Sequence, residues 1–420
     1  MRRRDWFDWH SWLGLTAGLM LFVICWSGTV AVFSHEIDWL LNPALRAQPV
    51  ESAVPFAEAK AAVEAARPDW EVWEVNAPRY RGFAMEVLAK VEPDVTHRVY
   101  VDPVTLEVLG DTSYLNVQRF FRSFHMALFQ ADFVYILGIP IGYFIVLLFV
   151  FPLLASAVMP LIFYKRWWRG FFKLTMGKGA KVFWSDFHKL TGLWSLWFVL
   201  LLCLTSFWYL AEWFIPGPTV PEAPQMEMAE KHSTETLITR AEAAFPELEV
   251  KSLGYYAAAD NMLYVSGHDG TVLTRGRAHI VLDMRTGEVI NLYHQGRSGL
   301  VARLMETVDV LHFGTFGKLW SQTLYFIFGL FLSGMCLTGA YLHAMRQKRK
   351  RPHGTRPAII GAYAVTVGCL GLAMVAGCSE VQGYGRLGAW PEVTFSVTCF
   401  LVIWCISTLA ALTIWMRALR

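Results

Sequence analysis

Residues 10–38 read HSWLGLTAGLMLFVICWSGTVAVFSHEID, and this stretch decides the fold. An apolar run fills positions 11–34, with His10 before it and His35-Glu36-Ile37-Asp38 at its end. About 20 apolar residues cross a bilayer, so the run predicts a membrane-spanning helix. It is too long for the apolar part of a signal peptide and no small-residue cleavage site follows it, so we expect the helix to be retained.

Further apolar runs of similar length follow along the chain. They lie at residues 133–164, 188–215, 319–345, 357–378 and 393–416. Of the 420 residues, 55% are hydrophobic and only 17% are charged, whereas a soluble domain carries about 25% charged residues. The composition therefore predicts an all-α bundle of six transmembrane helices in a lipid bilayer, and we expect no nucleic-acid partner.

The cysteines and the missing motifs exclude several classes of cofactor. The seven cysteines lie within or at the edge of apolar runs: Cys25, Cys203, Cys336, Cys369, Cys378, Cys399 and Cys405. Their placement excludes a secreted disulfide framework in the polar stretches. No CxxC or CxxCH occurs, which excludes cysteine-bound iron–sulfur clusters and covalently attached haem. GxGxxG and GxxxxGK[ST] are absent too, so any reductant must come from outside the chain.

Lysines and arginines in the short loops indicate the orientation. Positive charge gathers in residues 2–4, in loops 165–183 and 346–356, and at the C-terminus, whereas loop 379–392 carries only Arg386. Because positive short loops stay in the cytoplasm, both termini are predicted to be cytoplasmic. Residues 36–120 and 216–305 are then periplasmic, and the protein is placed in a bacterial inner membrane.

The first four spans and the two polar stretches form a repeat. His10-x-x-x-Gly14 recurs as His188-x-x-x-Gly192, 178 residues later. Each polar stretch has a helical pattern, at 56–66 and 235–245, followed by alternating strands that end in an Asp-x-x-Thr turn. A unit of about 180 residues, span–domain–span, is therefore predicted twice.

The predicted architecture follows from these patterns. Transmembrane helices occupy 1–35, 121–164, 184–215, 306–345, 357–378 and 393–416. The periplasmic domains occupy 36–120 and 216–305, and the cytoplasmic loops occupy 165–183 and 346–356. The two domains are expected to be small α+β units.

Histidines at the ends of the spans are the candidate site. His10 and His188 lie at the cytoplasmic ends of spans one and three, and His125 and His312 lie at the external side of spans two and four. Ionisable residues at membrane depth are costly and indicate function. Pairs of imidazoles at both faces favour axial ligation of two b-type haems, with one histidine of each pair from each repeat.

Other residues are reserves for the same site. On a straight helix, His35 is 25 residues after His10 and returns to nearly the same face, about 37 Å away, whereas His343 points away from His312. His35 is thus the better reserve ligand and His343 the weaker one. Three arginines, Arg119, Arg122 and Arg303, are candidates to bind haem propionates or another anion, or to act as interfacial anchors.

Several short motifs resemble one known family. They are His10-x-x-x-Gly14, Ser27-Gly28, Glu36-Ile37-Asp38, Phe124-His125-Met126-Ala127-Leu128, His188-x-x-x-Gly192, Leu311-His312-Phe313-Gly314-Thr315-Phe316-Gly317 and Thr338-Gly339. Over about residues 1–346 the chain resembles the PepSY-associated transmembrane family, which includes bacterial inner-membrane ferric-siderophore reductases. The resemblance implies a di-haem b electron carrier with two periplasmic PepSY domains, each a helix over a small antiparallel sheet. Thr205-Ser206 departs from the Thr-Gly pair that is usual in the third span.

The expected function is that of a membrane-bound oxidoreductase. It would carry electrons from a quinol or a cytoplasmic reductase to a periplasmic ferric siderophore or other iron(III) chelate, so that iron is released. Two alternatives stay open. The PepSY domains could bind a peptide or protein in a regulatory module without redox activity, or the histidines could serve a transporter. The absence of Asp and Glu deep in the spans counts against the transporter.

Overall fold

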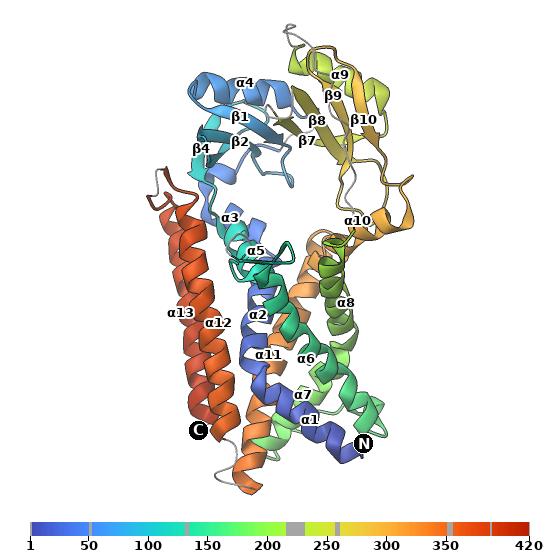
Figure 1. Ribbon diagram of the computed structural model, residues 1–420, viewed down its shortest axis with the longest axis vertical. Coiled ribbons are helices and arrows are strands. Elements are labelled where there is room, and N and C mark those ends of the chain that lie inside the picture. The colour runs from blue at the N-terminus through green and yellow to red at the C-terminus, as the bar shows by residue number, and fades with distance from the viewer. Residues whose placement is uncertain are drawn as a thin grey trace.

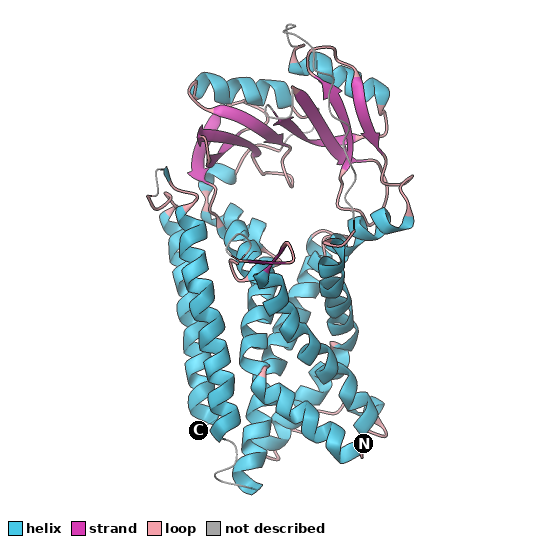
Figure 2. Ribbon diagram, in the orientation of Figure 1, coloured by secondary structure: helices cyan, strands magenta, loops and turns pink. Residues whose placement is uncertain are grey.

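The protein is built as a helical bundle that carries a β-sheet at one end (Figures 1 and 2). The computed structural model describes residues 2–49, 53–130, 134–215, 232–256, 261–350, 356–386 and 389–419. The first helix begins and the last helix ends far from the sheet (Figure 1). We call the two ends of the bundle the sheet end and the terminal end.

The long helices of the bundle are apolar. They are α1 (Arg3–Thr16), α2 (Gly18–Ala31), α6 (Ile141–Phe163), α7 (Ala180–Trp194), α8 (Leu196–Glu212), α11 (Leu319–Lys350), α12 (Arg356–Gln382) and α13 (Phe395–Leu419). Among the described residues, four single helices have the length and composition of a membrane span, and the number rises to six if α1–α2 and α7–α8 each count as one bent span. The chain is therefore a multi-pass membrane protein.

Both bent spans break at equivalent positions of the repeat. The axis turns by 64° between α1 and α2 and by 57° between α7 and α8. The breaks fall at Ala17 and Ser195, which are 178 residues apart, the same offset as His10 and His188. The straight helix assumed for His10 and His35 is therefore wrong, since α1 and α2 bend and His35 belongs to a third helix, α3 (Ser34–Leu41). The predicted shared helix face of His10 and His35, and their predicted separation of about 37 Å, therefore do not apply.

The sheet has eight antiparallel strands that come from both halves of the repeat. The first half gives β1 (Glu71–Asn76), β2 (Met85–Glu92), β3 (Val95–Val101) and β4 (Val108–Ser113). The second gives β7 (Glu249–Tyr256), β8 (Met262–His268), β9 (Ala278–Asp283) and β10 (Val289–Tyr293). Helices α4 (Phe56–Ala66) and α9 (Thr234–Ala244) cover one face (Figure 1). The helix-then-strands pattern expected in each polar stretch is thus present.

The two expected domains differ from the prediction in being joined. The strand order is β10-β9-β8-β7-β1-β2-β3-β4, so β1 pairs with β7 at the centre. Val75 pairs with Leu253 there, and both side chains are fully buried in a core that also contains Phe56 of α4 and Phe245 beside α9. An open strand edge exposes unpaired N–H and C=O groups, and the pairing of β1 with β7 removes one such edge from each half.

Both predicted Asp-x-x-Thr turns form. Asp102 accepts hydrogen bonds from the backbone N–H groups of Val104 and Thr105, at 2.8 and 3.0 Å. Asp283 closes the equivalent turn of the second half and also pairs with Arg285, at 3.1 Å. Burial raises the pKa of each carboxyl, but the hydrogen bonds outweigh it, so the pKa of each aspartate lies below its ordinary value.

Short elements lie between the strands of the sheet and the long helices, or between two helices. They are η1 (Pro43–Leu45), α5 (Val117–Ala127), the small hairpin of β5 (Tyr135–Ile136) and β6 (Ile139–Pro140), and α10 (Leu300–Phe313), with η2 (Trp167–Gly170) at the opposite end. The run expected to span from residue 133 therefore becomes helical only at Ile141. Residues 216–231 of the second expected domain and 351–355 of the expected loop 346–356 lie outside the described residues, and the start of that loop continues α11.

Candidate cofactor site: two histidine pairs

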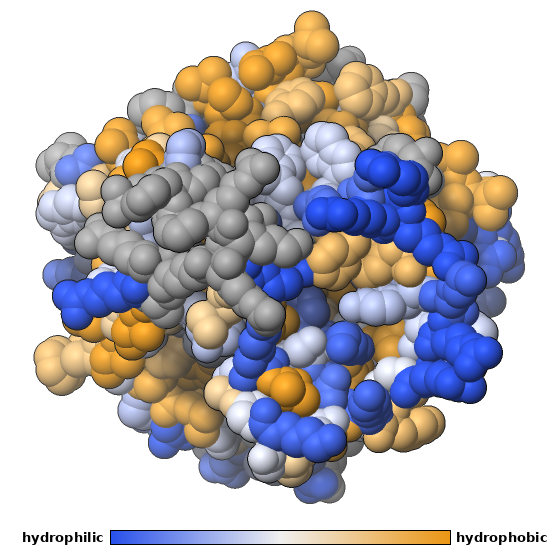
Figure 3. Space-filling model, turned by 90° about the horizontal axis from the view of Figure 1, so that it is seen from below, coloured by the Kyte–Doolittle hydropathy of each residue, from blue (hydrophilic) through white to orange (hydrophobic). Residues whose placement is uncertain are grey.

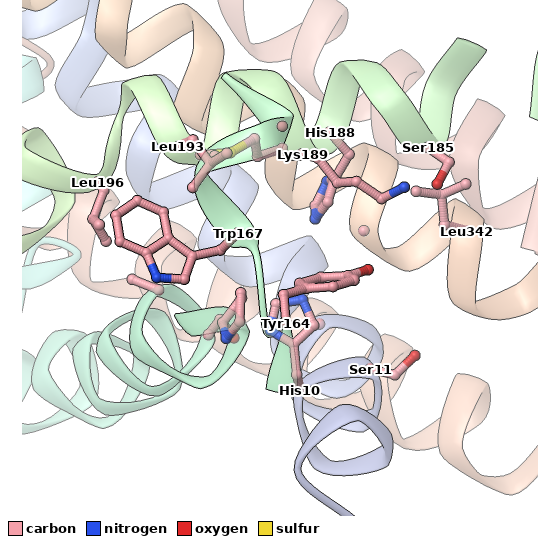
Figure 4. A pocket seen from close by; sticks show the side chains of 18 of the residues that line it. His10, Ser11, Tyr164, Trp167, Ser185, His188, Lys189, Leu193, Leu196 and Leu342 are labelled. Carbon is pink, nitrogen blue, oxygen red and sulfur yellow. The ribbon is translucent and has the colours of Figure 1, made fainter. Parts of the chain in front are cut away.

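The first pair is formed by His10 and His188 near the terminal end. His10 lies on α1 and His188 on α7, the two half-helices on the outer side of the breaks. Their ring centres are 6.4 Å apart, and the two rings face a common cavity (Figure 4). Because the breaks are equivalent, the bends turn both histidines inward in the same way.

The second pair is formed by His125 and His312 near the sheet end. His125 lies on α5 and His312 on α10, each close to the end of its short helix. Their ring centres are 6.3 Å apart. The structure therefore brings together the same partners that the repeat predicted, one histidine from each half in each pair.

The spacing of both pairs fits one metal ion between two imidazoles. A metal–imidazole nitrogen bond is about 2 Å long, so two bonds and two half-rings separate the ring centres by about 6 Å. Among the described residues, no three His, Cys, Asp or Glu side chains converge to hold a bare metal ion. Two opposed imidazoles would thus need a planar macrocycle such as haem to complete the coordination.

Threonine hydroxyl groups fix the tautomer of His312 and His188. Thr205 lies 2.7 Å from Nδ1 of His312, and its own hydroxyl proton is donated to the carbonyl of Leu201 at 2.9 Å. The hydroxyl can therefore only accept, so Nδ1 of His312 carries the proton and Nε2 keeps a free lone pair. Thr338 stands in the same relation to His188, at 3.0 Å. Ligating histidines typically donate their second ring N–H in this way.

His125 is held in the same tautomer by two acceptors. Its Nδ1 lies 3.0 Å from the carbonyl oxygen of Ile24 and 3.2 Å from Oγ of Ser27. Ser27 donates its own proton to the same carbonyl of Ile24, at 2.8 Å. His10 differs, since its buried Nδ1 has no hydrogen-bond partner among the residues that the structure describes.

Glycines leave room for two of the rings. A Cβ at Gly28 would come within 2.6 Å of the His125 ring, and a Cβ at Gly339 would come within 3.3 Å of the His188 ring. Each glycine follows the hydroxyl residue that bonds the same histidine, Ser27 or Thr338. In both cases the hydroxyl residue orients the imidazole ring, and the glycine that follows it lets the ring pack against the helix backbone.

Gly314 of the Leu-His-Phe-Gly motif ends α10. It has a φ of 65°, the left-handed conformation that glycine adopts at no steric cost. A Cβ there would also come within 2.6 Å of the Tyr325 ring, whose hydroxyl donates to the carbonyl of Leu311 at 2.6 Å. The motif therefore ends the helix directly after His312 and packs that end against α11.

A cavity of about 450 Å³ surrounds the first pair. Apolar residues of α1, α6, α8 and α11 line its inner part, and Trp167 and Tyr164 close one side (Figure 4). Its rim is mainly basic and carries one acidic residue, Asp186, beside Arg166, Arg169, Lys173, Lys181, Lys189 and Arg346. Hydrophilic side chains form an arc on the terminal end of the molecule (Figure 3). An apolar cavity with a basic rim suits a flat apolar cofactor that carries carboxylates.

Ionic contacts hold the helix of His312 to the sheet. Asp309 lies one turn before His312, accepts from the Tyr209 hydroxyl at 2.8 Å and pairs with Arg275 at 2.6 Å. Arg275 precedes β9 and also approaches Glu306 of the same helix, at 3.5 Å. The sheet thus fixes α10 through two carboxylates.

The helix of His125 is capped from another segment. The carboxylate of Asp38 on α3 accepts from the backbone N–H groups of Val117 and Gln118, at 2.8 and 2.9 Å. The two residues are the first of α5, whose N–H groups have no partner within the helix. This contact gives the Glu36-Ile37-Asp38 motif a structural role.

The reserve histidines lie outside both pairs. His35 is half-buried on α3. His343 is buried at the terminal end, where its Nδ1 lies 2.7 Å from Oγ of Ser11. That hydroxyl accepts from Arg346, so its proton is free to donate to Nδ1 of His343. His343 would then carry its proton on Nε2, the opposite tautomer to that of His312.

The three candidate arginines have different surroundings. Arg119 is engaged at the end of α12, by Glu380 at 3.3 Å and by Tyr384, two residues after the helix, at 2.7 Å. Arg122 and Arg303 are exposed and form no ion pair with another described residue. Of the three, only these two have guanidinium groups available to an anion.

Sequence reasoning missed the hydroxyl partners of the histidines. Ser27-Gly28 and Thr338-Gly339 stood out as short motifs, but their contacts to His125 and His188 depend on how the helices pack. Thr205 occupies the equivalent place for His312, so the Thr205-Ser206 departure keeps the hydroxyl and changes only the following residue.

Fold and site together define a duplicated, multi-pass membrane protein with histidine pairs toward both ends of its bundle. The chain belongs to the PepSY-associated transmembrane family, since the family model described as the PepSY-associated TM region matches residues 7–346. A comparison with curated proteins found no significant match.

Proposed function

We propose that the protein is a haem b-containing electron-transfer protein of the bacterial inner membrane that reduces a periplasmic ferric siderophore or other iron(III) chelate. The observation that carries this proposal is the pairing of four histidines at 6.4 and 6.3 Å. Three of the four present Nε2 as a free lone pair. A peptide-binding module has no need of such pairs.

The chain's own residues would position the cofactors. His10 and His188 would hold one haem, and His125 and His312 the other. Bound haem supplies reversible one-electron transfer at its iron. Thr205 and Thr338 keep the proton on Nδ1 of their histidines, and the apolar walls of the bundle exclude water.

Aromatic rings join α8 to α11. Trp197 packs edge-on against Tyr325 at 6.4 Å, and the Tyr325 hydroxyl is bonded to the residue before His312. We propose that this contact shortens the path between the two layers. One electron passed to the periplasmic side converts Fe(III) of the chelate to Fe(II), which the chelate holds weakly.

The proposed orientation places the six spans across the membrane with both termini in the cytoplasm. It is supported by the position of the sheet, which lies at the end opposite to that of the first and last helices (Figure 1). The positively charged loop 165–183 also lies at the terminal end. The donor would then be a quinol or a cytoplasmic reductase, and the acceptor would meet the His125–His312 pair beneath the sheet.

The test is reoxidation of the reduced protein by an iron(III) chelate. Protein reduced with one equivalent of dithionite per haem should be rapidly reoxidised by ferrioxamine or ferric citrate, with Fe(II) captured by a ferrous-specific dye. His312→Ala should slow this step sharply, whereas His188→Ala should leave an external haem that dithionite can still reduce. His279→Ala, in β9 of the sheet, is the matched control. Unchanged reoxidation in His312→Ala would contradict the proposal.

A further inference from the structure

The last two helices lie outside the region that defines the family. The family match ends at residue 346, whereas α12 and α13 occupy residues 356–419. They stand as a pair along one side of the bundle (Figure 1). Their contacts with the rest of the chain include the short helix α5, which carries His125.

A partly buried polar cluster joins α5 to the end of α12. Arg119 donates to the Tyr384 hydroxyl at 2.7 Å and to Glu380 at 3.3 Å, and the Tyr384 hydroxyl donates in turn to Glu380. Ser123 donates to the same carboxylate oxygen of Glu380, at 2.6 Å. Only 11% of the Glu380 side chain is exposed. A carboxylate this far from water needs such donors, and every donor here except Tyr384 comes from α5.

An aromatic cluster joins α5 to α13. The Trp404 ring lies 4.9 Å from Phe121, 5.5 Å from Phe124 and 6.0 Å from Phe120, in edge-to-face contacts. Phe121 and Phe124 are buried, and Trp404 is 6% exposed. Aromatic pairs of this geometry each contribute about 0.5–1.5 kcal/mol beyond the burial of their area.

Two further hydrogen bonds fix the pair at the sheet end. Ser396 at the start of α13 donates to the carbonyl of Leu41 at the end of α3, at 2.6 Å. Ser113 at the end of β4 donates to the carbonyl of Glu392, at 2.7 Å. These two bonds attach the start of α13 to α3, and the segment before α13 to β4.

These contacts surround α5. Arg119 and Ser123, one turn apart, contact Glu380 of α12, and Phe121 contacts Trp404 of α13. His125 bonds to Ile24 of α2 and faces His312. A helix of 11 residues has little stability of its own, so its direction is set by what it packs against.

We propose that α12 and α13 are a positioning unit for His125. In this unit the hydrogen bonds of Glu380 and Tyr384 hold α5 in place and thereby set the angle between the His125 and His312 rings. The inference rests on the proposed function for its consequence, which is control of the iron held by that pair. The hydrogen bonds of Glu380 and Tyr384 with α5 do not themselves depend on haem.

The experiment uses the full chain with Glu380→Leu, Glu380→Gln and Tyr384→Phe. Glu380→Gln keeps an oxygen acceptor for Ser123 and loses the charge, so it should restore much of what Glu380→Leu loses. Thr366→Val is the matched control, because Thr366 is a buried hydroxyl of α12 that donates only to its own helix, at 2.8 Å. If Glu380→Leu does not accumulate, Tyr384→Phe carries the same test with its ring retained.

Two readouts need no haem. Amide hydrogen exchange over 117–127 should become roughly tenfold faster in Glu380→Leu, as expected for the loss of a charge-assisted hydrogen bond. Carbethoxylation of His125 should rise, while that of His188 stays at the wild-type level. A third readout is the low-spin electron paramagnetic resonance signal of the sheet-end haem, which reports the angle between ligand planes and should shift while the other signal does not.

The outcomes separate the two proposals. Faster exchange and exposure of His125 in Glu380→Leu and Tyr384→Phe, with rescue by Glu380→Gln, support the positioning unit even if the wild-type protein holds no haem. A wild-type protein without haem would overturn the proposed function alone. Unchanged exchange and unchanged reactivity of His125 in both variants would overturn the positioning unit. An equal change in Thr366→Val would overturn it too.

Discussion

Nδ1 of His312 lies 2.7 Å from Oγ1 of Thr205, a residue of a different helix and 107 positions earlier in the chain. The hydroxyl proton is used within α8, so the ring must donate. Thr338 and His188 repeat this arrangement in the other pair. In each layer, one threonine hydroxyl therefore decides which imidazole nitrogen of one histidine is free.

Replacing Thr205 with valine should weaken cofactor binding at the sheet end only. Valine has nearly the same shape but leaves the N–H of His312 without an acceptor. Loss of such a partner typically costs about 10–100-fold in metal affinity or activity. Haem titration of the apoprotein should show one weakened site and one unchanged site, and Thr205→Ser should restore the first. Two unchanged sites in Thr205→Val would show that the hydroxyl does not position His312.

Replacing Asp38 with asparagine should loosen α5. The carboxylate caps the first two N–H groups of α5, and asparagine would keep one acceptor while losing the charge. We expect a loss of roughly 1 kcal/mol in the free energy of unfolding. Thermal denaturation in detergent measures it, with exposed Asp69→Asn as the control. Equal melting temperatures for both variants would contradict the capping role.

The sheet should lose stability as the pH falls. The folded-state pKa of Asp283 is below its ordinary value because its hydrogen bonds and Arg285 outweigh burial. Its contribution is therefore present above the unfolded pKa, about 3.9, and is lost as the pH falls through the folded value. Melting temperatures from pH 7 to pH 3 should fall more steeply for wild type than for Asp283→Asn. Parallel curves would show that this turn carries no such linkage.

Reporter fusions test the orientation of the chain. Asp94 lies in the turn between β2 and β3, and Gly270 follows β8, so both belong to the sheet. Fusions at these residues should report the periplasm, and a fusion after Arg169 at the terminal end should report the cytoplasm. The reverse pattern would place the sheet in the cytoplasm and reverse the proposed direction of electron flow.

The local elements of the fold could be predicted because their signals are local. The helix at Phe56–Ala66 and both Asp-x-x-Thr turns follow from periodicity and turn chemistry within a few residues. The pairing of the histidines followed from the repeat, since equivalent positions of two similar halves meet across a pseudo-symmetry axis. Membership of the PepSY-associated transmembrane family was likewise predicted and is confirmed.

What could not be predicted depends on contacts far apart in the sequence. The apolar pattern continues through Ala17 and Ser195 without proline, so this pattern does not predict the bends. The pairing of β1 with β7 depends on how the two halves meet in space. The contact of Arg119 with Glu380, 261 residues later, likewise could not be predicted from the sequence.

The central claim is that each histidine pair holds a haem. The most direct measurement is a pyridine haemochrome assay of the purified full-length protein from haem-replete cells, together with its electron paramagnetic resonance spectrum. We expect two non-covalent b-type haems per chain with low-spin, bis-imidazole signals. One haem per chain would mean that one pair is not a site. A colourless protein would contradict the account and favour a peptide-binding role for the sheet.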